Sequence, residues 1–196
     1  MLLFIMPAWA GDDCLAYKLT PRVDLETPMW SKEVVQPLRQ MDLLHGNVVA
    51  TMVDNYDIVA DITNIEDGYC VTLKSVYAVV GYSDFLVQID IRHMPDTCTY
   101  NAILAHEDEH IRAYLSVMDD FKKELQDSIY SAADSITPIF VRNASDIDAA
   151  ITELNAELQA HPDLILVKQK IKAAEEIRNK RVDQHDTGAT LRACFE

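Results

Sequence analysis

The spacing of hydrophobic residues changes near residue 97. Before this point, every second residue of 85–91 is apolar, with Leu86, Gln88 and Asp90 between them, and residues 71–80 are rich in β-branched residues. The period of two predicts a strand over residues 85–91, and the β-branched composition predicts one over residues 71–80. Residues 81–84, Gly-Tyr-Ser-Asp, form a turn-type cluster between them. The pattern therefore predicts a β-hairpin over residues 71–91.

After this point the apolar residues recur at spacings of three, four and seven, at Leu104, Ile111, Leu115, Met118, Leu125 and Ile129. This spacing predicts one long helix, from residues 97–99 to about residue 133. A second helix is predicted from residue 145 or 146, broken at His161-Pro162. A third continues from residue 163 to about 182, and the polar segment 183–189 is predicted to be a turn.

The region before residue 70 is less regular. A short strand is expected within residues 16–24, and a short helix within 30–44, broken near Pro37. Residues 47–63 fit a strand or a helix equally well. The fold class predicted for the chain is therefore α+β: a small mixed or antiparallel sheet with a β-hairpin, followed by a long helix and a helical C-terminal half.

The chain has 196 residues, half of them apolar, and a formal net charge of −15. Such a length and composition are typical of a globular domain. The negative charge argues against nucleic acid and anionic lipid as partners, because both are themselves anionic. No apolar run approaches the length of a membrane span, so no stable membrane insertion is expected.

Residues 1–10 are apolar and end in Ala-Trp-Ala, a small-x-small cleavage pattern. We interpret them as the remnant of a signal peptide cleaved near Ala10, and residues 11–196 as a single domain. The expected location is periplasmic or secreted.

The four cysteines are even in number and lack Cys-x-x-Cys spacing, which in an exported chain favours two disulfides. Three pairings are possible. The favoured one is Cys70–Cys98, bracketing the predicted hairpin, with Cys14–Cys194 joining the two ends.

The predicted long helix carries His106, Glu107 and His110. Histidines four residues apart lie on one face of a helix, where both can bind one metal ion. The glutamate between them lies close enough to reach a water molecule on that metal without being a ligand. This is the His-Glu-x-x-His arrangement of zinc hydrolases, with His106 and His110 as ligands and Glu107 as the catalytic base.

Catalytic zinc needs a third protein ligand. Glu124 shares the helical face of His110 but lies about 21 Å further along the axis, too far to reach. The ligand must come from another element, where the candidates are His45, His93, His161, Asp183, His185 and the later glutamates. His185 is the favoured ligand because it lies where the helical half ends. Asp183 in the same predicted turn is the second possibility.

Residues 98–110, following the predicted hairpin, resemble the core of the zincin-like metallopeptidases. More narrowly, the chain resembles a group of small secreted bacterial proteins described as zinc-dependent proteases, in which a long helical segment and a C-terminal turn with Asp and sometimes His-Gly follow the motif. The resemblance implies one Zn²⁺ per chain and a peptide or protein substrate, which would lie along the strand before the motif helix, here residues 85–91. Tyr100 or Tyr114 could then stabilise the oxyanion.

Two other functional hypotheses compete with the metallopeptidase hypothesis. One is a non-catalytic exported module that keeps the zincin scaffold for binding or for structure. The other is a protein that buffers or senses metal, which an open site with two histidines and a glutamate fits less well.

Overall fold

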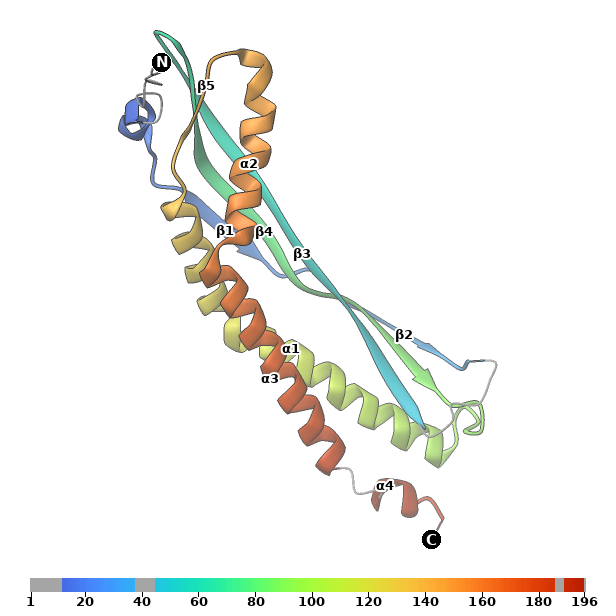
Figure 1. The fold of residues 1–196 in the computed structure, drawn as a ribbon. Coiled ribbons are helices and arrows are strands. Elements are labelled where there is room, and N and C mark those ends of the chain that lie inside the picture. Colours follow the sequence, from blue (N-terminus) through green and yellow to red (C-terminus); the bar gives the residue numbers. More distant parts are fainter. Residues whose placement is uncertain (1–11, 38–44, 186–188, 196) are drawn as a thin grey trace, which may run out of the picture. The chain divides into compact units, whose positions relative to one another are not determined.

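The computed structural model describes residues 12–37, 45–185 and 189–195. Within these ranges the chain forms a mixed five-stranded sheet and a series of helices, so the predicted α+β class is confirmed at this level (Figure 1). The predicted signal peptide, residues 1–10, lies outside the described residues. No helix in the described ranges combines the length and apolar character that a membrane span requires.

The sheet is organised around its longest strand, β4 (Gly68–Ile89). Strands β1 (Arg22–Glu26), β2 (Ser31–Val35), β3 (Gly46–Ile65) and β5 (Ile139–Val141) all pair with it. The β2 pairing is parallel and the β5 pairing antiparallel, so the sheet is mixed as expected. Residues 47–63, which fitted strand or helix equally, are strand, and a strand replaces the expected helix over residues 31–35.

The predicted hairpin turn at residues 81–84 is wrong, because β4 runs through it unbroken. The hairpin is formed instead by β3 and β4, whose connection is Glu66-Asp67. Gly81 has a different role within the strand: its φ is +150°, and a Cβ there would lie 3.0 Å from Cδ of Pro28. A side chain at this position would be strained and crowded, so the glycine serves a close approach rather than a turn.

Residues 85–91 are also not a sheet edge. β2 pairs with β4 from Ser31 opposite Asp84 to Val35 opposite Gln88. On the other side β3 pairs with β4, and the Asp90 amide donates to the carbonyl of His45 just before β3, at 2.9 Å. Both sides of this stretch are therefore occupied, and it cannot receive an extended substrate by strand addition.

The helices follow the predicted pattern closely. α1 (Cys98–Ser135), α2 (Ile147–Ala160) and α3 (Pro162–His185) match the three expected helices, including the break at His161. α3 extends further than predicted, so Asp183 to His185 are helical rather than part of a turn. A short helix, α4 (Ala189–Arg192), follows.

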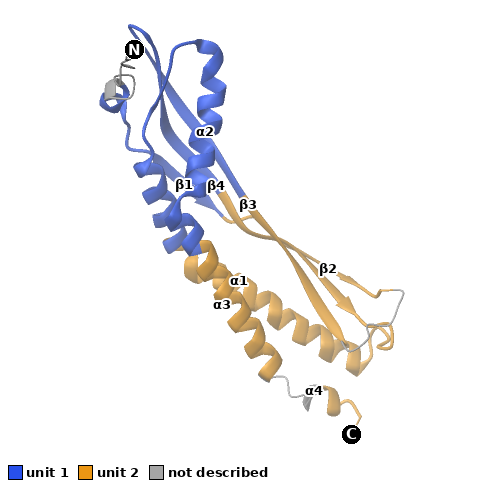
Figure 2. Cartoon of the chain, viewed as in Figure 1, with its two compact units in different colours: residues 1–26, 55–78, 124–167 blue, residues 27–54, 79–123, 168–196 orange. Residues whose placement is uncertain are grey.

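The described chain divides into two compact units (Figure 2). The long elements β3, β4, α1 and α3 each contribute residues to both units. Unit 1 contains residues 1–26, 55–78 and 124–167, and unit 2 contains residues 27–54, 79–123 and 168–196. In unit 1, α2 packs on β5 and buries Ala150, Leu154 and Leu158. Unit 2 contains the first part of α1, the second part of α3 and the strand segments paired with β2.

Within unit 2 the helices are fixed to the sheet and to each other by polar contacts. Tyr82 of β4 donates a hydrogen bond to Glu175 of α3 and packs on Tyr114 of α1, with ring centroids 5.0 Å apart. Arg178 of α3 donates to Ser116 and Asp120 of α1. These contacts set the relative position of α1 and α3, and thereby of the side chains on their facing sides.

Two disulfides are present, as expected, but the favoured pairing is wrong. Cys14 pairs with Cys70, and Cys98 pairs with Cys194. Residues 70 and 98 do not bracket a hairpin, because Cys70 is near the beginning of β4 and Cys98 begins α1. Each disulfide joins residues of one unit, Cys14–Cys70 in unit 1 and Cys98–Cys194 in unit 2.

Candidate metal centre

Glu107 occupies a core position of α1. Ile103, Glu107 and Ile111 follow one another at spacings of four, and all three are buried. On an amphipathic helix such positions are normally apolar, because a buried carboxylate loses its hydration. A carboxylate that is only 4% exposed on this stripe is therefore a strong indication of a specific chemical role.

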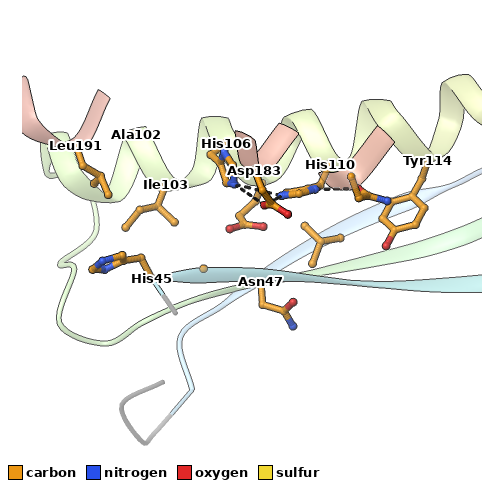
Figure 3. A pocket seen from close by; sticks show the side chains of 13 residues that line it. His45, Asn47, Ala102, Ile103, His106, His110, Tyr114, Asp183 and Leu191 are labelled. Carbon is orange, nitrogen blue, oxygen red and sulfur yellow. Dashed lines mark hydrogen bonds and ion pairs between the residues drawn. The ribbon is translucent and has the colours of Figure 1, made fainter. Parts of the chain in front are cut away.

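His106 and His110 lie half-buried on the neighbouring face of α1, and Asp183 of α3 reaches the same point (Figure 3). Nε2 of His110 is 3.2 Å from Nε2 of His106 and 3.1 Å from Oδ1 of Asp183. Nε2 of His106 is 3.7 Å from the same Asp183 oxygen. Two imidazole nitrogens and one carboxylate oxygen thus converge from two helices.

This arrangement fits a metal ion. Ligand atoms about 2.0–2.2 Å from a tetrahedral ion lie roughly 3.3–3.6 Å from one another. The three separations in the cluster, 3.1, 3.2 and 3.7 Å, fall close to this range. Imidazole nitrogens and a carboxylate oxygen are also the nitrogen and oxygen ligands that zinc takes in proteins. The group His106, His110 and Asp183 could therefore hold a metal ion.

The cluster opens into a pocket of about 400 Å³, lined by residues of α1, α3, α4 and the beginning of β3. Its polar lining includes Glu107 and Tyr114 beside the three possible ligands, and His45 and Asn47 come from the sheet side (Figure 3). Tyr100, the other tyrosine considered from the sequence, does not line it. The pocket leaves room for a substrate next to the cluster.

Glu107 packs against Gly46, the first residue of β3. A Cβ placed on Gly46 would lie 2.6 Å from Cγ2 of Ile103 and 3.0 Å from Cδ of Glu107. Only glycine therefore allows this strand to approach the helix so closely. Burial raises the pKa of Glu107 to about 7; Asp183 and Asp108 contribute to the increase, and His110 opposes it. A carboxyl group with such a pKa can accept and release protons near neutral pH.

The other histidines considered as ligands do not join the cluster. His45 and His93 contact each other instead, with Nδ1 of His45 2.9 Å from Nε2 of His93. Nδ1 of His161 accepts a weak hydrogen bond from the Asp163 amide at the beginning of α3. His185 is the last residue of α3, and its side chain lies outside the described part of the chain, so its role as a ligand stays a prediction.

Two residues of the site were missed in the sequence. Oδ1 of Asn179 accepts a hydrogen bond from Nδ1 of His110, at 2.8 Å, and Gly46 makes room for Glu107. Asn179 could have been found, because it precedes Asp183 by four residues and repeats on α3 the spacing of His106 and His110 on α1. No sequence signal links Gly46 to Glu107.

Comparison with protein-family models, with curated proteins and with solved structures gives no match for this chain. The chemistry of the site itself is therefore the basis for inferring function.

Proposed function

We propose that this chain is an exported zinc-dependent metallopeptidase. The observation that supports the proposal most strongly is one pocket that combines three convergent ligands, His106, His110 and Asp183, with the buried carboxylate of Glu107. Three nitrogen and oxygen ligands with an open side are typical of catalytic zinc, whereas structural zinc sites are closed by four protein ligands. The two disulfides support export, because they persist in oxidising compartments.

The ion would be held by His106, His110 and Asp183. When bound there, zinc supplies a Lewis acid and lowers the pKa of a bound water molecule. Glu107 accepts the proton of the attacking water and then delivers it to the amine that leaves. Its buried position favours this role, because a carboxylate with a pKa of about 7 is a stronger base than an exposed one.

The substrate would lie along β3 rather than along residues 85–91. Among the described residues β3 pairs only with β4, so its other edge has no partner strand. Asn47 and Val48 of β3 line the pocket beside Glu107. An extended peptide that pairs with this edge would place a peptide bond next to the cluster. Tyr114 also lines the pocket, and its hydroxyl is the proposed donor to the carbonyl oxygen.

The test compares wild type with Glu107→Gln and with Glu109→Gln, a control at an exposed position of the same helix. Each protein is loaded with zinc, its metal content is measured, and it is assayed on a library of quenched fluorescent peptides. We expect about one zinc per chain in all three proteins and a loss of hydrolysis of about 10²–10⁴-fold in Glu107→Gln alone. Equal hydrolysis by Glu107→Gln and wild type would contradict the proposal. Zinc binding without hydrolysis in any of the proteins would favour a non-catalytic binding module.

A further inference from the structure

Asn179 is held in a single orientation on α3. Its Nδ2 lies 3.0 Å from the backbone carbonyl oxygen of Glu175, one turn earlier. A carbonyl oxygen only accepts hydrogen bonds, so the amide atom facing it must be the NH₂ group. The other amide atom, Oδ1, is therefore the one that lies 2.8 Å from Nδ1 of His110.

This orientation determines which nitrogen of His110 carries the proton. Because Oδ1 of Asn179 only accepts, Nδ1 of His110 must be the donor. In a neutral imidazole one nitrogen donates and the other accepts, so Nε2 of His110 has its lone pair available. That nitrogen faces His106 and Asp183, at 3.2 and 3.1 Å.

We propose that Asn179 is the positioning residue of the candidate metal centre, which fixes the tautomer and ring orientation of His110 so that Nε2 is presented to a metal ion. The donor role of Nδ1 is inferred from the contacts of Asn179, whereas its effect on metal binding rests on the proposed function. A hydrogen bond to the nitrogen opposite the metal is a general means of orienting an imidazole ligand.

The position of Asn179 is itself fixed by neighbours on α3. Glu175, whose carbonyl orients the amide, receives a side-chain hydrogen bond from Tyr82 of β4. Arg178, next to Asn179 in the sequence, donates to Ser116 and Asp120 of α1. The amide is thereby held against His110 from the sheet and from the motif helix. Because it is neutral, it accepts a hydrogen bond without adding a further carboxylate beside Glu107 and Asp183.

The first test measures the tautomer in the metal-free protein. The two imidazole nitrogens of His110 are distinguished by long-range ¹H–¹⁵N NMR at pH 8, with a chelator present, in wild type, Asn179→Leu and Asn179→Asp. Asn155→Leu on α2 is the control, since Asn155 is also half-buried, helical and hydrogen-bonded within its own helix. We expect the Nδ1–H form in wild type, in the control and in Asn179→Asp, which keeps an acceptor. In Asn179→Leu the Nδ1–H form should give way to Nε2–H.

The second test measures zinc affinity by competition with a chelating dye. Losing the orienting acceptor should weaken binding by about 10–100-fold in Asn179→Leu, while Asn179→Asp and the control bind within a few-fold of wild type. An Nδ1–H form that persists in Asn179→Leu, or an unchanged zinc affinity, would overturn the inference. Loss of the Nδ1–H form in Asn179→Asp would also overturn the inference. If Asn179→Leu does not fold, this measurement on Asn179→Asp provides the test. If wild type binds no zinc, the proposed function fails, but the tautomer measurement still decides the role of Asn179.

Discussion

Replacing Glu107 by glutamine should change how the stability of the metal-free protein depends on pH. Burial raises the pKa of this carboxyl group from 4.5 to about 7. A group with a raised pKa binds its proton more tightly in the folded chain than in the unfolded chain. Its contribution to stability is therefore complete below about pH 4.5 and is lost as the pH rises through about 7. Glutamine does not titrate, so the variant lacks this contribution.

The structure sets the size of the effect. At 1.36 kcal/mol per pKa unit, an increase from 4.5 to about 7 corresponds to an upper bound of about 3 kcal/mol in the free energy of unfolding. Although Glu107 is only 4% exposed, it lines the pocket, and solvent screening from that side reduces the effect. We therefore expect roughly 1–2 kcal/mol between pH 5 and pH 8.

The assay is urea unfolding followed by circular dichroism, with a chelator present, at pH 5 and pH 8. Wild type should lose roughly 1–2 kcal/mol more than Glu107→Gln over this interval. Glu109→Gln, which changes an exposed carboxylate of the same helix, should follow wild type. If Glu107→Gln and wild type lose the same amount, Glu107 is hydrated in the folded chain, and the reasoning about its burial is wrong.

Three further perturbations test other parts of the site. Gly46→Ala would place a Cβ 2.6 Å from Cγ2 of Ile103, so we expect a loss of about 1–3 kcal/mol in chemical denaturation and reduced peptide hydrolysis; unchanged values for both would show that β3 moves aside freely. Replacing Cys98 and Cys194 together by serine opens a loop with a sequence separation of 96, which should cost about 3–5 kcal/mol in urea unfolding, and a loss below 1 kcal/mol would contradict this. Adding zinc should raise the melting temperature of wild type but not of His110→Ala, and an equal increase in both would exclude His110 as a ligand.

The helices were predictable because their signals are local. The apolar spacing of α1, α2 and α3 needs no knowledge of the rest of the chain, and His161-Pro162 marks a break by its own backbone restrictions. One detail of α1 was nevertheless misjudged. The buried stripe runs through Ile103, Glu107 and Ile111 rather than through Leu104 and Leu115, which are half-exposed. A glutamate on the core face was not expected from hydrophobicity alone.

The strands and disulfides could not be predicted in the same way, because they depend on partners distant in the sequence. Gly81 looks like a turn residue until the neighbouring Pro28 is known, and the alternation of residues 85–91 does not reveal which strands lie on either side. The candidate third ligand shows the same limit. The sequence pattern predicts a turn for both Asp183 and His185, whereas α3 continues through them and brings Asp183 to the two histidines of α1.

The disulfide pattern has a consequence for how the chain matures. Cys14–Cys70 and Cys98–Cys194 join cysteines that are consecutive in the sequence, and neither loop encloses the other. If the chain enters an oxidising compartment from its N-terminus, Cys70 is the first thiol that Cys14 meets, and this pair can close before Cys98 arrives. Oxidation in the order of arrival would thus produce the native bonds directly. No thiol–disulfide exchange would then be needed to correct the pairing.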